Sequence, residues 1–324
     1  MNPTPFNPGP PESAAPRAGV RPAAAPRFSV ILPTRNRKLP LLRALASLES
    51  QSLPRETYEI IVVDDGCVDG TAAALEARAR AGGLSVARTP GLGPAAARNA
   101  GLALARGRIL AFTDDDCEVP REWLERLADA LGPGGADAVG GSARNGLPSA
   151  LAGVYQDMAG HFYRVHNREP GRARFLTTNN FACRRRALDA VGGFDERFRL
   201  GGSDREMAQR MVERGLRVDY RPELTVMHFH HFRLLTFLRH LYLQGKGSHL
   251  YRRVIARERP SPAGGLGVAG YARMLAGVAR GHGWRGGALR VGLALLGQAA
   301  VLAGFAVAAA QSPGSGKNIE RARA

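Results

Sequence analysis

RILAFTDDD, residues 108–116, joins a short apolar run directly to three successive aspartates. YEIIVVDDG, residues 58–66, shows the same arrangement earlier in the chain, with β-branched residues leading into two aspartates. A third apolar run, FSVIL at 28–32, ends at Pro33. Short apolar runs rich in β-branched residues and closed by turn-forming residues are typical of buried strands. Each run therefore predicts a strand, and two of the strands carry carboxylates at their C-terminal ends.

Predicted helices separate these strands, because apolar or alanine residues recur between them at helical spacing. Strands that alternate with helices predict an α/β fold with a mostly parallel sheet and helices on both faces. In such sheets ligands bind beyond the carboxyl ends of the strands, so we expect the two acidic clusters to meet at one edge. The predicted helices span 39–48, 70–81 and 95–105 and begin again at Pro120, and a further strand spans 84–88.

The second half of the chain has weaker periodicity. Leucines at helical spacing predict a basic amphipathic helix over 232–253. Two short strands are expected on either side of Pro222. The remaining expectations are extended segments at 136–142 and 175–183, a helix at 203–214, and the two strands at 216–220 and 223–227.

The three adjacent carboxylates Asp114, Asp115 and Asp116 repel one another unless a cation or strong donors neutralise them. Mg²⁺ and Mn²⁺ prefer oxygen ligands and often bind one or two carboxylates together with substrate phosphates. An acidic cluster directly after a buried strand therefore favours a site for a metal–diphosphate complex. The alternative is a solvated turn with a helix cap before Pro120.

Two further motifs are weaker signals of a nucleotide site. Asp64 or Asp65, at a strand end, can accept hydrogen bonds from a base edge or a ribose, although Asp65-Gly66 is also a common turn dipeptide. Arg98 and Asn99 lie near the start of a predicted helix behind a glycine-rich turn, where a guanidinium and backbone N–H groups suit a diphosphate. A surface arginine is the alternative for Arg98.

Taken together, six segments resemble the family 2 glycosyltransferases, which have the GT-A fold, in order and in spacing. The resemblance covers about one domain, from Phe28 to His230. It implies an inverting, metal-dependent, hexosyltransferase-like enzyme that transfers a sugar from a nucleotide-diphosphate sugar. The Gln-x-x-Arg-Trp motif of processive members does not follow Asp204, which favours addition of a single sugar. The segments are FSVILPTRNR (28–37), EIIVVDDGCVDGT (59–71), GPAAARNAGLALARG (93–107), ILAFTDDDCEVP (109–120), TNNFACRRRALDAVGGFDERF (178–198) and GGSDREMAQRMVERG (201–215).

The resemblance also implies a metal site and a donor site. Asp115 is the first expected ligand of a divalent Mn²⁺ or Mg²⁺, with Asp116 and His228 as further ligands. Thr113 replaces the first aspartate of the usual Asp-any-Asp motif, which leaves the ligand set open, and the histidines near His228 could instead be packing residues. The expected donor-binding residues are Pro33, Thr34, Arg35, Asp64, Asp65, Arg98, Asn99, Asp114 and Asn180.

Asp204 lies at the position of the family's catalytic base, although Ser203 replaces the glutamate that normally precedes it. A base at this position takes the proton of the acceptor hydroxyl as the oxygen attacks the anomeric carbon. A helix N-cap is the alternative role for Asp204. The alternative function is a non-catalytic homologue that binds nucleotide-sugar or glycan, favoured by Ser203 and Thr113 and opposed by the retained Asp115 and Asp204.

Other α/β classes fit less well. A dehydrogenase would carry G-x-G-x-x-G after the first strand, where this chain has Pro33-Thr34-Arg35-Asn36. A receiver domain would be shorter and would not need the second acidic cluster. A sugar nucleotidyltransferase would have a glycine-rich basic loop after the first strand.

Composition divides the chain into three parts. Residues 1–26 are rich in proline and alanine and predict a disordered leader, 27–231 form the predicted transferase domain, and 232–324 form a basic helical region. The net charge of +17 lies mainly in this last part, where Lys and Arg outnumber Asp and Glu. Without nucleic-acid motifs, this charge favours a membrane surface or a phosphate-linked acceptor as the partner.

The uncharged run at 291–310 is long enough to cross a membrane, but its alanine and glycine content makes it a weak candidate. A membrane span, an interfacial helix and a helix packed on the catalytic domain all remain open. Three widely spaced cysteines, Cys67, Cys117 and Cys183, suit a reducing cytoplasm. We therefore expect a cytoplasmic protein at the inner face of the cell membrane, with a glycan, lipid-linked or cell-envelope polysaccharide precursor as acceptor.

Overall fold

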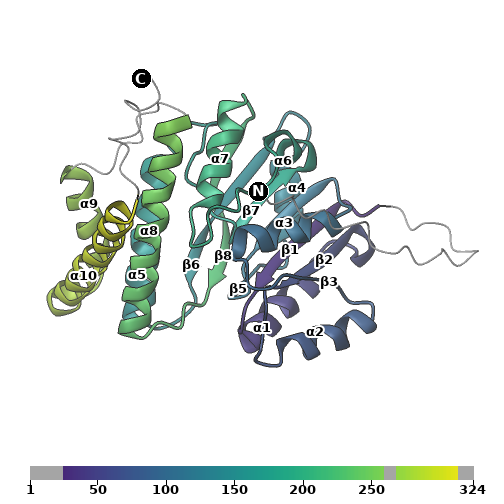
Figure 1. Ribbon diagram of the computed structural model, residues 1–324, viewed down its shortest axis with the longest axis horizontal. Helices are drawn as coiled ribbons and strands as arrows, with labels where there is room; N and C mark the ends of the chain where they lie inside the picture. Colours follow the sequence, from purple (N-terminus) through teal and green to yellow (C-terminus); the bar gives the residue numbers. More distant parts are fainter. Residues whose placement is uncertain (1–24, 259–267, 313–324) are drawn as a thin grey trace, which may run out of the picture.

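The computed structural model describes residues 25–258 and 268–312. Within these residues, eight strands form one sheet in the order β3-β2-β1-β4-β7-β6-β8-β5 (Figure 1). The predicted leader at 1–26 lies outside the described residues except for its last two positions. The strands are β1 (Phe28–Thr34), β2 (Tyr58–Asp64), β3 (Ser85–Arg88), β4 (Ile109–Thr113), β5 (Cys117–Glu118), β6 (Ala138–Asn145), β7 (Asn180–Arg184) and β8 (Val218–His228).

The first four strands are all parallel, as predicted, with β1 paired to both β2 and β4. Beyond β4 the sheet is mixed, because β7 runs antiparallel to β4 and β6 while β6 and β8 are parallel. The predicted α/β class is confirmed, with helices on both faces of the sheet. These helices are α1 (Lys38–Glu49), α2 (Thr71–Arg80), α3 (Pro94–Leu104), α4 (Trp123–Ala130), α6 (Arg185–Val191) and α7 (Ser203–Glu213).

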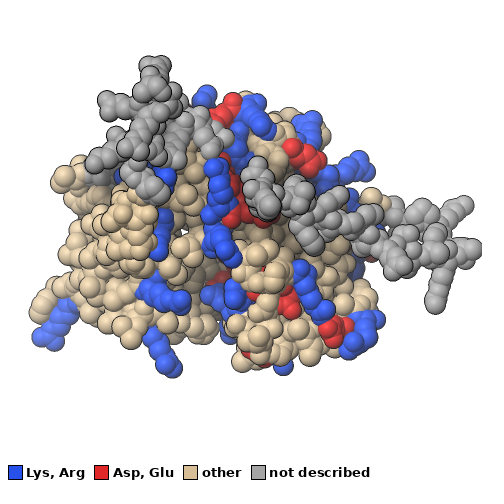
Figure 2. All heavy atoms as spheres, in the orientation of Figure 1, with Lys and Arg blue, Asp and Glu red and all other residues tan. Residues whose placement is uncertain are grey.

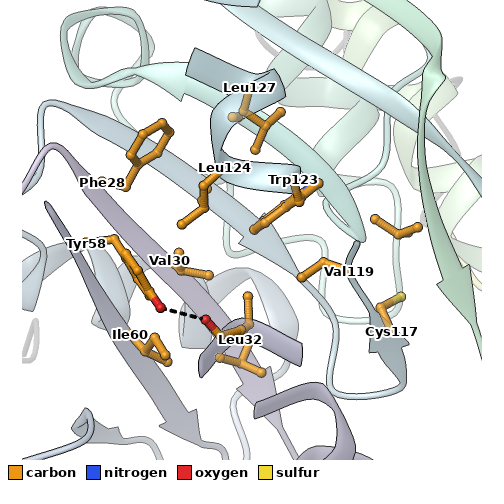
Figure 3. Packing of buried hydrophobic residues seen from close by; sticks show 14 of the residues in the cluster. Phe28, Val30, Leu32, Tyr58, Ile60, Cys117, Val119, Trp123, Leu124 and Leu127 are labelled. Atoms are coloured by element: carbon orange, nitrogen blue, oxygen red, sulfur yellow. Dashed lines mark hydrogen bonds between the residues drawn. The ribbon is translucent and has the colours of Figure 1, made fainter. Parts of the chain in front are cut away.

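Two apolar layers cover the two faces of the sheet. Successive strand residues point to opposite faces, so Val30 and Leu32 of β1 enter one layer and Ile31 enters the other. The first layer packs the leucines of α1 onto the sheet. It also contains the apolar side of α4, where Trp123, Leu124 and Leu127 lie over the sheet residues (Figure 3). The second layer is formed with α3, α6 and α7. Burial of β1 and β2 on both faces explains why they read as continuous apolar runs.

Tertiary contacts changed several predicted elements. Val218–His228 is one strand and not two, because its register against β6 shifts between Gly141 and Ser142 and accommodates Pro222 as an irregularity. A proline, which has no N–H to donate, is tolerated at such a bulge. The extended segment predicted at 175–183 reduces to the strand β7, and the helix expected at Pro120 begins only at Trp123.

Four helices form a unit beside the sheet (Figure 1). The predicted helix over 232–253 extends to 258, and the uncharged run at 291–310 belongs to a longer helix. Two of the four helices have weak sequence signals and were not predicted, namely α5 and α9. The four are α5 (Ala150–His166), α8 (Leu234–Glu258), α9 (Val268–Ala279) and α10 (Gly283–Ala310).

Gly101 allows α3 to lie close against the sheet. A Cβ at this position would be 2.6 Å from Ile31 Cγ2 and 3.0 Å from Val63 Cγ2. We expect Gly101→Ala to lower the free energy of unfolding by about 1–3 kcal/mol, because the extra methyl overpacks the core. Denaturant unfolding would measure the change. The matched control is Gly277→Ala in α9, where a Cβ meets nothing within 4 Å. An unchanged stability for Gly101→Ala would contradict the close packing.

Candidate active site

The two acidic clusters meet at one edge of the sheet, as the sequence predicted. Thr34 at the end of β1 is in register with Asp64 at the end of β2, because the two strands are parallel. The Thr34 hydroxyl donates a hydrogen bond of 2.7 Å to Asp115 Oδ2, just beyond β4. Residues distant in sequence are thus joined by a buried contact at the carboxyl ends of three neighbouring strands.

Arg37 neutralises much of the buried charge in the second acidic cluster. Its Nη1 lies 2.6 Å from Asp116 Oδ2 and 3.2 Å from Asp115 Oδ1. Burial raises the pKa of Asp115 to about 6, while the charge of Arg37 acts in the opposite direction. Sequence reasoning missed Arg37, although its place in PTRNR, just after the first strand, was an available signal.

Asp116, His228 and His230 form a buried group whose ligand atoms all lie within 4.8 Å of one another. β5 and β8 create it, because Cys117 pairs with His228 in their antiparallel register. His228 Nε2 lies 3.0 Å from Asp116 Oδ1, and His230 Nδ1 lies 3.6 Å from Asp116 Oδ2. The buried Nε2 of His230 has no hydrogen-bond partner.

The electrostatics of this group fit a cation. Burial acts to raise the pKa of Asp116, but His228 and Arg37 outweigh it and hold that pKa well below its ordinary value. Burial and the neighbouring His228 lower the pKa of His230 to about 2, so His230 is a neutral imidazole. A buried carboxylate beside a neutral imidazole with a free nitrogen is a suitable ligand set for a divalent metal.

The structure brings together two of the three predicted metal ligands, Asp116 and His228, and adds His230. Asp115 lies beside them, but its two oxygens already accept hydrogen bonds from Thr34 and Arg37. Aromatic residues enclose the histidines. Tyr155 of α5 contacts His230 edge-on, with ring centroids 4.6 Å apart, and Phe232 stacks on the same ring at 4.7 Å.

Asp65 organises the glycine-rich loop before α3. Its Oδ1 accepts hydrogen bonds from Thr89 Oγ1 at 2.6 Å and from the Leu92 N–H at 2.8 Å, and its Oδ2 accepts from the Gly93 N–H at 3.0 Å. Asp64 instead accepts from the Cys67 N–H at 2.8 Å. Both aspartates therefore shape the backbone around the predicted nucleotide site.

Arg98 of α3 pairs with the strand-end cluster. Its Nη2 donates to Asp114 Oδ1 at 2.7 Å, and its buried Nε has no hydrogen-bond partner. Asp204 lies in the first turn of α7, and its Oδ1 accepts from the Arg205 N–H at 2.9 Å. Burial raises the pKa of Asp204 above its ordinary value, while Arg98 acts against the rise and Asp114 adds to it.

The N-cap role considered for Asp204 is not what the structure has. The cap position of α7 is Gly202, which has a positive φ of 96° and makes no side-chain cap. The Asp204 carboxylate also accepts a long hydrogen bond of 3.4 Å from the Thr178 N–H. It thus joins α7 to the segment before β7.

Two predicted donor-binding residues have structural partners instead. Asn180 is fully buried, donates to the carbonyl oxygens of Ser142 and Leu224, and accepts from Trp123 Nε1. Its amide thus joins β7, β6, β8 and α4, and both of its N–H groups have protein partners. Asn99 exchanges hydrogen bonds with the backbone of Phe194 and so holds the loop before α7.

A basic pocket of about 520 Å³ opens beside this site. Arg35 and Arg199 both donate to the Gly91 carbonyl oxygen across it. Its lining contains four basic side chains and no acidic one, which suits an anionic ligand. Sequence reasoning missed three of these cations, although the arginines of FDERFRLGG were a visible signal. The lining residues are Arg35, Gly91, Leu92, Gly93, Arg197, Arg199, Leu200, Gly201, Lys246, Gly247 and Leu250.

Three named proteins are similar in sequence. Glycosyltransferase AglE of Haloferax volcanii is 29% identical over 206 residues, which are 63% of this chain and 67% of AglE. The pre-mycofactocin glycosyltransferase of Mycobacterium tuberculosis is 29% identical over 235 residues, covering 67% of this chain and 46% of the relative. The poly(ribitol-phosphate) β-N-acetylglucosaminyltransferase TarS of Staphylococcus aureus is 35% identical over 104 residues, 32% of this chain and 18% of TarS. The chain thus matches less than half the length of the last two.

Two solved structures share the fold. The mannosyltransferase PcManGT from Pyrobaculum calidifontis, in complex with GDP-Man and Mn²⁺, aligns with a TM-score of 0.62 at 22% identity and covers 89% of this chain and 87% of that one. TarS residues 1–349 of S. aureus in complex with UDP-GlcNAc align with a TM-score of 0.51 at 17% identity, covering 86% and 89%. The predicted GT-A fold is confirmed by these neighbours.

The sequence model of glycosyl transferase family 2 matches residues 29–192. This range holds β1 to β7, both acidic clusters and Arg98. Since the match covers half of the chain, this chain belongs to glycosyl transferase family 2.

Proposed function

We propose that this chain is a metal-dependent enzyme that transfers a single hexose from a nucleotide-diphosphate sugar to an acceptor hydroxyl, with inversion at the anomeric carbon. The position of Arg98 carries the proposal. Its guanidinium lies 2.7 Å from Asp114 in the strand-end cluster, and its charge acts on Asp204 on a different element. A cation that pairs with one of these carboxylates and lowers the pKa of the other suits a leaving phosphate, whose developing negative charge it would stabilise.

Asp204 is the proposed general base. Its carboxylate accepts the hydroxyl proton as the acceptor oxygen bonds to the anomeric carbon, and the bond from that carbon to the diphosphate oxygen breaks with its electrons leaving on the diphosphate. A raised pKa makes Asp204 a stronger base than an exposed aspartate. Attack from the face opposite the leaving group in one step inverts the anomeric centre.

The donor would lie along the carboxyl ends of β1 and β2. Arg35 and the loop held by Asp65 are the proposed contacts for the nucleotide, and Arg98 would stabilise charge on the leaving diphosphate. Two proteins of the same fold support a nucleotide-sugar donor, since PcManGT was solved in complex with GDP-Man and TarS in complex with UDP-GlcNAc. A Mn²⁺ or Mg²⁺ held by Asp116, His228 and His230, with Asp115 nearby, would supply further charge stabilisation for the diphosphate.

The acceptor is proposed to be a glycan, a lipid-linked sugar or a polysaccharide precursor of the cell envelope. The basic pocket, which Gly201 lines just before α7, supports an acceptor that carries phosphate, since Arg199 and Lys246 on its wall lie outside the strand-end cluster. We also propose that the protein works in the cytoplasm at the inner face of the membrane. The apolar helix α10 supports this location.

A non-catalytic homologue that binds nucleotide-sugar or glycan is the second candidate. Two substitutions favour it. Ser203 replaces the expected glutamate. Thr113 replaces the first aspartate of the metal motif, and its buried hydroxyl donates a hydrogen bond to the Asn179 carbonyl oxygen and so supplies no ligand. A screen of nucleotide sugars with Mn²⁺, reading the release of nucleoside diphosphate, separates the two. An enzyme releases it; a binding protein shows calorimetric binding without release.

Removing the proposed base tests the mechanism directly. We expect Asp204→Asn to lower the rate of transfer by about 10²-fold to 10⁴-fold, because the amide cannot accept the proton. Nucleotide affinity, measured by calorimetry, should stay near that of the unmodified protein. The control is Asp129→Asn on the exposed side of α4. Loss of nucleotide binding in Asp204→Asn would assign Asp204 to structure instead.

The raised pKa of Asp204 predicts the acid side of the pH profile. Transfer should fall as the pH is lowered, because protonation removes the base, with a midpoint above the value of about 3.9 for an exposed aspartate. Steady-state rates of nucleotide release from pH 4 to 8 would measure it. A midpoint at the ordinary value would argue against Asp204 as the titrating group.

Metal binding can be tested without measuring activity. Mn²⁺ titration followed by electron paramagnetic resonance should show at least about tenfold weaker binding for His228→Ala and His230→Ala, because each loses a ligand. The matched control is His231→Ala, since His231 is exposed and contacts Arg43. The same titration of Asp115→Asn tests the ligand first expected from sequence. Equal affinity in all the histidine variants would contradict the proposed site.

A further inference from the structure

One long face of α10 is exposed and contains only apolar or small residues beyond Arg290. Over Val291–Ala310 the exposed residues are leucine, alanine, glycine and valine, the one polar residue, Gln298, is half-buried, and Leu302 is 65% exposed. An outward face of a helix in contact with water is normally polar. This face therefore indicates a non-aqueous neighbour.

The opposite face of α10 is fixed to the rest of the protein along its length. A Cβ at Gly304 would lie 1.9 Å from the Tyr242 carbonyl oxygen, and one at Gly297 would lie 2.6 Å from Leu241 Cδ1. Near the start of α10, Arg290 is buried and pairs with Asp157 of α5 at 2.6 Å. At the far end, His249 Nε2 lies 3.1 Å from the Ser312 hydroxyl.

The charges around this face have one sign. Every charged residue of α9 and α10 is an arginine, and Arg280 between them is exposed. Trp284, at the start of α10, is 79% exposed and lies under the Arg285 guanidinium. In Figure 2 the area over α9 and α10 is mostly uncharged, with basic groups around it and no acidic ones. An apolar face with an exposed tryptophan and arginines at its edge complements the surface of an anionic bilayer.

From these observations we propose that the exposed face of α10 docks on an anionic lipid bilayer with the helix axis parallel to the membrane plane. This inference rests on the membrane location proposed above and specifies its geometry. The helix enters one leaflet and does not cross the bilayer.

Packing is the reason that α10 does not cross. α8 runs beside it through Tyr242, Gly245 and His249, and the same helix presents Lys246 to the basic pocket. If α10 crossed the bilayer in this packing, Lys246 would enter the hydrocarbon region, because the adjacent Gly245 lies against Val301, midway along the uncharged run. Burying such a group in lipid costs several kcal/mol. Contact along one face avoids that cost.

The geometry places the site close to the membrane. Lys246, Gly247 and Leu250 line the basic pocket from α8, while Tyr242 and Gly245 of α8 contact α10. The pocket is thus separated from α10 by the width of one helix, about 8–10 Å between axes. An acceptor whose lipid part stays in the leaflet can reach the pocket with its polar end.

Depth measurement distinguishes the two orientations. In a Cys67→Ser background, nitroxide labels would be placed one at a time through Leu289→Cys, Leu296→Cys and Ala303→Cys, all on the exposed face. The protein would be bound to vesicles of phosphatidylglycerol and phosphatidylcholine. A helix in the membrane plane gives nearly equal depths at the three positions. A spanning helix gives depths that differ by about 20 Å between the first and last labels, at 1.5 Å per residue, and this result would overturn the proposal.

Vesicle co-sedimentation tests whether the face binds lipid. Leu296→Glu and Leu302→Glu should each weaken binding to the anionic vesicles at least about tenfold, with thermal unfolding unchanged. Leu39→Glu on α1, a leucine 73% exposed, is the matched control. Failure of the unmodified protein to bind the vesicles would refute the docking. A dimer in solution that Leu296→Glu dissociates would refute it as well, because the face would then bind a second copy of the chain. Nucleotide release with a soluble acceptor, measured in the same variants, reports separately on the transferase proposal.

Discussion

The parallel pairing of β1 with β2 on one side and β4 on the other is the constraint on which the site depends. Parallel strands end at the same edge, so Asp64, Asp65 and the run Asp114–Asp116 must come together there. The Thr34–Asp115 hydrogen bond closes the contact between the two clusters. The apolar layers on both faces hold the strands in this register and leave only their ends accessible to a ligand.

Gathering carboxylates in a buried place creates a charge that the fold must offset. Arg37 pairs with Asp116, Arg98 pairs with Asp114, and His228 Nε2 lies 3.0 Å from Asp116 Oδ1. The two arginines come from separate segments of the chain, and together they make the acidic edge compatible with burial. The same requirement suits a bound divalent cation, because a metal ion would add to the positive charge that already offsets the carboxylates. The electrostatics of stability and of ligand binding are therefore set by the same residues.

The helical unit adds a second constraint on the site. β8 ends at His228, and the aromatic residues that enclose the neighbouring His230 come from α5 and from the segment before α8. Lys246 of α8 lines the basic pocket. The unit that carries the apolar α10 face is thus part of the site wall and not a separate appendage. Close glycine contacts between α8 and α10 fix that face relative to the pocket.

The sequence by itself determined the alternation of strands and helices through β4 and the meeting of the acidic clusters, because strand and helix periodicity are local and parallel topology dictates which strand ends converge. It also predicted Asp116 and His228 as neighbours through the family resemblance. Only the tertiary structure decided that His230 joins them, that Arg37 pairs with the aspartates, and that Asn180 is a buried structural amide. The place of His230 depends on the register of β8 against β5, and the pairing of Arg37 depends on the contact between the ends of β1 and β4, neither of which a local pattern specifies. The orientation of α10 was likewise undecided in sequence, since an uncharged run left a span, an interfacial helix and a packed helix open until the contacts of Gly297 and Gly304 were known.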